Sequence, residues 1–158
     1  MALVAGNVLA VAIAAFYPPI TMSIMFLYWA ECVVVGAFNV AKMQYVPGHD
    51  RADRIGVAVL FLVHYGGLTF MCFGVLHQLA RFELRQRGMP QFDFGAYYAG
   101  FIWVVLILAA GHAVSFVRNF LGRREYESRS LDQQMWRPYR RVVLMIGIVF
   151  AACCLVIV

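Results

Sequence analysis

The order of hydrophobic and polar positions divides this chain into long apolar runs separated by short polar loops. The runs cover about residues 2–17, 20–43, 55–80, 95–119 and 141–158. A mostly apolar stretch of roughly 18 residues or more is typical of a membrane-spanning helix. We therefore predict an all-α fold, a polytopic membrane helix bundle of about five transmembrane helices, which forms a single domain over residues 1–158.

The first run is shorter than the roughly 20 residues that a helix usually needs to cross a bilayer. It lacks the positively charged segment that begins a secretory signal peptide, so we interpret it as a membrane span. Pro18 and Pro19 in the sequence YPPIT interrupt helical structure and favour a tight turn. The first two spans are therefore predicted to be antiparallel neighbours.

Composition agrees with a membrane protein. The chain is 63% hydrophobic and 13% charged, with a mean hydropathy of +0.76, whereas soluble domains carry about a quarter charged residues. The net charge of +5 could indicate a nucleic-acid partner. The arginines flank the apolar runs, however, and alternate with acidic residues, so contact with lipid headgroups explains them and we expect no nucleic-acid partner.

The distribution of basic residues predicts the orientation. With five spans, one side of the membrane carries ten basic residues and the other carries Arg81, Arg85 and Arg87. Because cytoplasmic loops are enriched in Lys and Arg, we expect the amino terminus inside and the carboxyl terminus outside. The ten residues are Lys42, Arg51, Arg54, Arg118, Arg123, Arg124, Arg129, Arg137, Arg140 and Arg141.

Ionisable side chains inside the spans are the candidate functional residues, because an unpaired charge within a membrane is unfavourable. At about 1.5 Å per residue, Glu31 lies roughly 18 Å from the cytoplasmic end of its span, His64 roughly 14 Å and His112 roughly 10 Å. His77 is placed at the opposite interface. Three helices thus bring one carboxylate and two imidazoles to a similar depth.

This combination predicts an intramembrane metal site with Glu31, His64 and His112 as ligands. Zinc is the favoured ion and iron the second choice. The site could be structural, or it could activate a water in a metal-dependent intramembrane hydrolase. Weaker ligands or supporting residues around the site are predicted to be Asn39, Ser115, Asn119, Tyr28 and Tyr65.

Two alternatives remain open at this stage. Glu31 and the histidines could form a metal-free proton-handling or polar network. His64 and His112 could also bind a non-covalent haem as axial ligands in an electron-transfer bundle. The four cysteines all fall within predicted spans and are interpreted as packing residues.

Several segments resemble a family of uncharacterised bacterial multi-pass integral membrane proteins. The family pattern has Tyr-Trp-x-Glu…Asn…Lys, His-Tyr-Gly and His…Ser-Phe…Asn segments. The matching stretches here are YWAE with GAFNVAKM, HYGG, GHAVSFVRNF and RPYRR, which extend from about Tyr28 to Arg141. Family members carry further histidines where this chain has Cys72 and Met145, so a larger histidine-rich site is not expected here.

The resemblance implies a bacterial inner membrane location and supplies no function. It also implies that the polar positions of these segments belong together: Glu31, Asn39, His64, His112, Ser115 and Asn119.

The expected partners are the lipid bilayer and a second copy of the chain. Small residues at Gly95, Ala99 and 109–111 offer a surface for close helix contact on the fourth span. We therefore predict a homodimer.

Overall fold

The computed structural model describes residues 20–89 and 91–157, and every regular element in these ranges is a helix. The elements are α2 (Ile20–Met43), α3 (Arg51–Gln86), α4 (Phe94–Ser115), the π-helix η1 (Phe116–Leu121), the 3₁₀ helix η2 (Glu125–Ser128), α5 (Leu131–Trp136) and α6 (Tyr139–Ile157).

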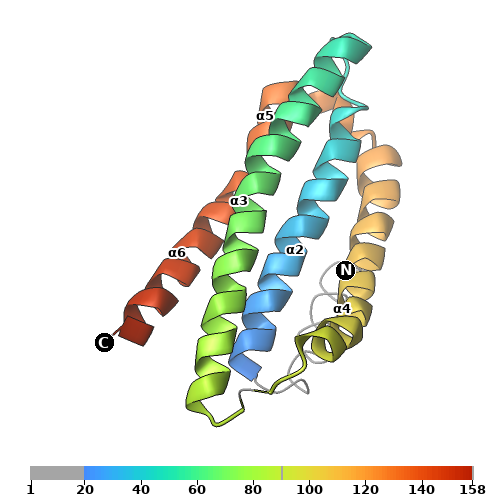
Figure 1. Cartoon of the computed structure of the whole chain (residues 1–158). Coiled ribbons are helices and arrows are strands. Elements are labelled where there is room, and N and C mark those ends of the chain that lie inside the picture. The colour runs from blue at the N-terminus through green and yellow to red at the C-terminus, as the bar shows by residue number, and fades with distance from the viewer. Residues whose placement is uncertain (1–19, 90, 158) are drawn as a thin grey trace.

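The long helices lie along one bundle, in which α2 and α3 are antiparallel, whereas α4 runs parallel to α2 and α6 runs parallel to α3 (Figure 1). Figure 1 shows α2 between α3 and α4, with α6 packed on the other side of α3. The short helix α5 lies at the end of the bundle where α2 ends and α3 begins. The loop 44–50 and the segment 116–138 therefore share one end of the bundle, and residues 87–89 and 91–93 lie at the other (Figure 1).

The structure confirms the all-helical fold. Within the described ranges, three helices are long and apolar enough to cross a membrane: α2, α3, and α4 continued by η1. The second predicted span has the same bounds as α2. The last predicted span is helical as α6, whereas the first lies outside the described residues. The number of about five spans therefore stays a prediction.

Helix α3 is longer than the span predicted within it. Its 36 residues extend roughly 54 Å, well beyond a hydrocarbon layer of about 30 Å. Asp50 caps its start by accepting a hydrogen bond from the Asp53 N–H at 2.7 Å. Hydropathy marks the lipid-facing part of a helix, whereas capping and helix propensity set its ends.

The interface between α2 and α3 depends on a close approach at Gly36. A Cβ added at Gly36 would lie 2.6 Å from Cε1 of Tyr65, so only hydrogen fits there. The Tyr65 hydroxyl donates to the Cys32 carbonyl at 2.9 Å, and the Trp29 indole N–H donates to the Thr69 carbonyl at 2.9 Å. These contacts fix the rotation of α2 about its axis, and so decide which of its side chains face α3.

Large apolar side chains on the outside of the bundle agree with a lipid environment. Val63, Phe70 and Trp103 are 71%, 77% and 66% exposed. Monomeric soluble proteins rarely expose large contiguous apolar patches, whereas in a bilayer the same side chains contact acyl chains.

Candidate functional site

A cavity of about 750 Å³ lies at the end of the bundle that carries α5. Helix α2 forms one wall, α4 with η1 forms a second, and the segment from η2 to the start of α6 forms the third. The lining residues are Val35, Phe38, Asn39 and Lys42 from the first wall, His112, Ser115, Asn119 and Phe120 from the second, and Glu125, Gln133, Gln134, Trp136, Arg137, Pro138, Arg140 and Arg141 from the third.

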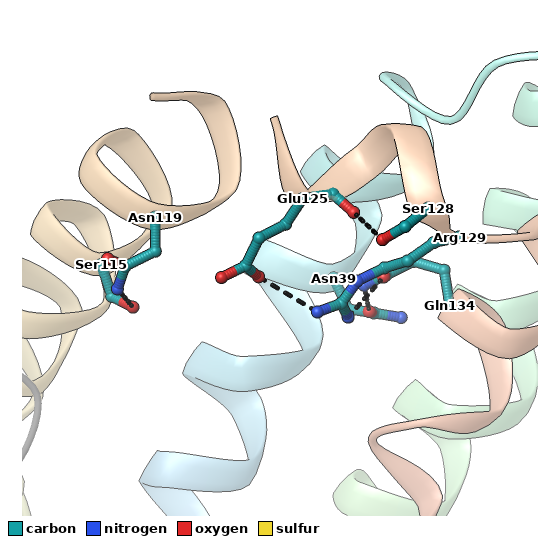
Figure 2. Close-up of polar contacts among 7 residues, drawn as sticks. All are labelled: Asn39, Ser115, Asn119, Glu125, Ser128, Arg129 and Gln134. Atoms are coloured by element: carbon teal, nitrogen blue, oxygen red, sulfur yellow. Dashed lines mark hydrogen bonds and ion pairs between the residues drawn. The ribbon is translucent and has the colours of Figure 1, made fainter. Parts of the chain in front are cut away.

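A hydrogen-bonded chain of side chains holds the third wall against α2 (Figure 2). The Gln134 side-chain amide donates to Asn39 Oδ1 at 2.5 Å. Arg129 donates from Nη1 to Gln134 Oε1 at 3.3 Å and from Nη2 to Glu125 Oε2 at 3.0 Å. Asn39 is 3% and Gln134 1% exposed, so the link between α2 and α5 is buried, whereas its extension through Arg129 to Glu125 on η2 is partly exposed.

The helix that forms the second wall changes from α to π geometry at the cavity. In η1 the Gly122 N–H donates to the Val117 carbonyl, five residues earlier, at 2.9 Å. A Cβ at Gly122 would lie 2.7 Å from the Arg118 carbonyl oxygen, so glycine is needed where this turn ends. Asn119 lies within the π-helix and donates to Ser115 Oγ at 3.2 Å (Figure 2). Such wide turns often occur at functional sites.

The charges around the cavity are predominantly positive. Lys42, Arg137, Arg140 and Arg141 line it, and Glu125 is the acidic residue among the described lining residues. Two of these five charges are compensated. Glu125 pairs with Arg129 at 3.0 Å, and Arg141 pairs with Glu31 at 2.6 Å.

Three cations therefore face the cavity without a carboxylate. Among the residues that the structure describes, no Asp or Glu lies within ion-pair distance of Lys42, Arg137 or Arg140. Lys42 Nζ lies 5.4 Å from the centroid of the Phe120 ring, a cation–π contact, and the charge of Glu125 acts on it from beyond ion-pair distance. Arg137 and Arg140 are exposed. The cavity consequently attracts anions.

The Glu31–Arg141 pair connects this cavity to the interior of the bundle. Arg141 lines the cavity, whereas Glu31 is absent from its described lining. The Glu31 side chain is 13% exposed and that of Arg141 is 38% exposed. The Arg141 carbonyl also accepts a hydrogen bond from the Tyr28 hydroxyl at 3.3 Å. The first turn of α6 is thereby attached to α2 at two points.

His112 lies in the wall of the cavity, where its ring stacks on Phe38 with centroids 6.0 Å apart and an interplanar angle of 26°. Its Nε2 and the Asn39 Nδ2 are buried without a hydrogen-bond partner among the described residues. Buried polar atoms nearly always have a hydrogen-bond partner. At this part of the cavity wall, the described protein groups leave the hydrogen-bonding capacity of these two atoms unused.

The structure does not support the predicted metal site. Glu31 binds Arg141, and His64 is an exposed residue whose Nδ1 lies 2.8 Å from the Tyr139 hydroxyl. His112 contacts Phe38 instead. In the part of the chain that the structure describes, no group of three or more His, Cys, Asp or Glu side chains is arranged to hold a metal ion. The predicted zinc or iron therefore has no structural support, and the haem alternative stays a prediction.

Other predicted residues do come together. Asn39, His112, Ser115 and Asn119 all line the cavity. Tyr28 and Tyr65, predicted to support the metal ligands, are used to connect helices: Tyr28 binds the Arg141 carbonyl, and Tyr65 the Cys32 carbonyl.

Sequence reasoning assigned Arg137, Arg140 and Arg141 to membrane orientation and lipid headgroup contact and so missed their place at the site. One signal was present. Arg140 precedes the last apolar run and Arg141 begins it, and a long basic side chain at such a position can extend along its own helix toward a polar group.

Comparison with known proteins gives a family and no function. The model of a family of unknown function, DUF6498, matches residues 1–158. No curated protein matches the chain, and no solved structure does.

Proposed function

Because this chain belongs to the DUF6498 family, a family of unknown function, we propose a function from the cavity itself: the protein is a membrane-embedded binding protein for a phosphate-bearing ligand. The observation that carries the proposal is the group of three cations, Lys42, Arg137 and Arg140, that face one cavity without a carboxylate partner in the described chain.

Arginine suits this ligand chemistry. Its planar guanidinium donates two parallel hydrogen bonds to phosphate oxygens, and such charge-assisted bonds are about twice as strong as neutral ones. Lys42 adds a compact positive charge from the opposite wall. The amide side chains of Gln133 and Asn119 supply neutral donors between them.

The size and position of the cavity agree with a small ligand. Its volume of about 750 Å³ falls within the roughly 300–1,000 Å³ of typical small-molecule sites. It lies at the end of the bundle that carries the basic loops, which the positive-inside rule places in the cytoplasm. Two sources of the ligand fit this position: the headgroup of an anionic lipid in the inner leaflet, or a soluble phosphate ester.

A polar site without metal was one of the alternatives open from the sequence. The Glu31–Arg141 pair supports this alternative in a changed form, with an arginine in place of a histidine as the partner of the carboxylate. A metal-dependent hydrolase receives no such support, since the described residues contain no group of ligands for the ion.

The test is a binding measurement on the purified full-length chain with two probes, glycerol phosphate in detergent and phosphatidylglycerol in nanodiscs. The Arg137→Gln/Arg140→Gln variant removes two of the three cations. We expect it to weaken binding at least tenfold, because one hydrogen bond to a charged group contributes about 1.5–3 kcal/mol. Binding of glycerol phosphate identifies a soluble source, and binding of phosphatidylglycerol alone identifies a lipid.

A matched control separates the site from general surface charge. Arg118 and Arg123 are exposed arginines at the same end of the bundle that are not among the cavity-lining residues. The Arg118→Gln/Arg123→Gln variant has the same net charge as the cavity variant. Equal weakening by both variants, or binding of neither probe by the unmodified protein, would refute the proposal.

A further inference from the structure

A chain of hydrogen bonds leads from Arg129 through Gln134 to Asn39, and chemistry fixes its direction (Figure 2). A guanidinium donates hydrogen bonds but cannot accept them. Because Arg129 Nη1 donates to the Gln134 side-chain amide at 3.3 Å, that amide must turn its oxygen toward Arg129 and its nitrogen toward Asn39. Asn39 must then offer its oxygen, Oδ1, to Gln134. Rotation of either amide by half a turn would place two donors against each other.

The unused end of this chain is the side-chain nitrogen of Asn39. Its oxygen accepts from Gln134, and its Nδ2 is a buried atom with no hydrogen-bond partner among the described residues. Asn39 is 3% exposed and lines the cavity. A buried donor without a partner is unfavourable. A ligand atom that accepts from Nδ2 therefore stabilises the complex more than one that accepts from an exposed donor already bonded to water.

Asn39 lies beside the cations of the cavity but one helical turn deeper in the bundle. Lys42 follows it by three residues and is nearer the end of α2 at Met43. Side chains at this spacing are neighbours, with Cβ atoms about 5–6 Å apart. His112 faces the same part of α2, since its ring stacks on Phe38, and its Nε2 is a second buried atom without a partner among the described residues. A ligand whose phosphate binds at Lys42 can therefore place its adjoining atoms beside Asn39 and His112.

We infer that the ligand carries a hydroxyl group close to its phosphate, and that Asn39 Nδ2 donates a hydrogen bond to this hydroxyl. The inference rests on the proposed function and specifies the ligand class: a phosphate ester of a polyol, either soluble or as the headgroup of a lipid. An ionised phosphate only accepts hydrogen bonds, and Lys42, Arg137 and Arg140 supply donors for it. A hydroxyl accepts from Asn39 and also has a proton to donate, so it suits the imidazole of His112, in which a nitrogen without hydrogen accepts.

The experiment compares ligands that differ only in these hydroxyls, on the purified full-length protein. Glycerol phosphate is compared with propyl phosphate by isothermal titration in detergent, and phosphatidylglycerol with phosphatidylpropanol by native mass spectrometry of nanodiscs. The two members of each pair have the same phosphate charge and the same number of carbon atoms. In each pair that binds, we expect the hydroxyl-bearing member to bind at least about threefold more tightly, which is the effect of one neutral hydrogen bond.

Variants of two asparagines test the role of Asn39. Asn39→Asp keeps the shape of the side chain and an acceptor for Gln134, and replaces the Nδ2 donor by a carboxylate oxygen. Asn119→Asp makes the same change on the second wall of the cavity. Both variants weaken phosphate binding through the added negative charge, but only Asn39→Asp is expected to abolish the preference for the hydroxyl-bearing member. The ratio of the two affinities is the measured quantity, because a general loss of affinity leaves it unchanged. If the added charge abolishes all binding, the neutral variant Asn39→Leu, which is close in size, gives the ratio.

The possible results are distinct. Equal affinities within each pair in the unmodified protein would overturn the inference while the proposed function stands, and this result needs no variant to be folded. A preference that persists in Asn39→Asp or Asn39→Leu, or that Asn119→Asp abolishes as well, would overturn the assignment to Asn39. Failure of all four probes to bind would overturn the proposed function together with the inference.

Discussion

Gly36 on α2 faces the ring of Tyr65 on α3 so closely that a Cβ at Gly36 would lie 2.6 Å from Tyr65 Cε1. We expect Gly36→Ala to lower the stability of the fold, because the Tyr65 ring must move and lose its 2.9 Å hydrogen bond to the Cys32 carbonyl. Overpacking of this kind costs about 1–3 kcal/mol. The measurement is the midpoint of thermal unfolding in detergent.

The matched control for that prediction is Gly74→Ala. Gly74 lies on α3, and a Cβ at this position would meet nothing within 4 Å. This variant is expected to unfold at the temperature of the unmodified protein or slightly above it, since alanine favours helix over glycine. Equal destabilisation by the two substitutions would contradict the steric explanation.

The Glu31–Arg141 pair predicts strong non-additivity in a double-mutant cycle. Replacement of Arg141 removes the 2.6 Å ion pair of the largely enclosed Glu31 carboxylate, so we expect Arg141→Gln alone to destabilise the protein clearly. Loss of one partner of a buried pair costs roughly 3–5 kcal/mol, and the partial exposure of Arg141 reduces that figure here. The double variant Glu31→Gln/Arg141→Gln should be more stable than Arg141→Gln. Additive effects of the two substitutions on the unfolding midpoint would show that the pair contributes no coupling.

The metal content of the purified protein tests directly whether Glu31 is the ion-pair partner of Arg141 or a metal ligand. Since its carboxylate binds Arg141, we expect zinc and iron well below one ion per chain, and the same content in Glu31→Gln and His64→Ala. Elemental analysis of all three proteins is the measurement. One zinc or iron per chain that is lost in both variants would restore the predicted metal site.

The charge distribution predicts the orientation of the bundle in the membrane. The loop 44–50 and the segment 116–138 share one end of the bundle (Figure 1). Together with the adjoining helix ends they hold ten of the 13 basic residues, so we expect this end in the cytoplasm. A reporter that is active only outside the cytoplasm should be inactive when inserted after Gly122 and active when fused after Val158. The opposite pattern would contradict the positive-inside assignment, and activity at neither position would mean that the number of spans is not five.

Much of the fold follows from the sequence alone. The apolar run at residues 20–43 coincides with α2. The loop after it contains Pro47, and Gly48 with a φ of 80°, both of which favour a turn over further helix. The polar segment before the last run forms α5, whose capping box uses Ser130 and Gln133. These are local effects, fixed by neighbours within a few residues.

The partner of Glu31 was decided by the tertiary structure. Sequence spacing estimates how far a side chain lies along its own helix, and Glu31, His64 and His112 were placed at similar depths for that reason. Depth does not give the rotation of a helix about its axis, nor which helices are neighbours. Packing places α2 between α3 and α4, and contacts such as Gly36 against Tyr65 set the rotation. Sequence spacing places Arg141 at the start of the last run and Glu31 deeper in its own span. In the structure the long Arg141 side chain bridges this difference and reaches Glu31. A buried charge pairs with the group that the packing of the helices brings within reach. That packing depends on several helices at once.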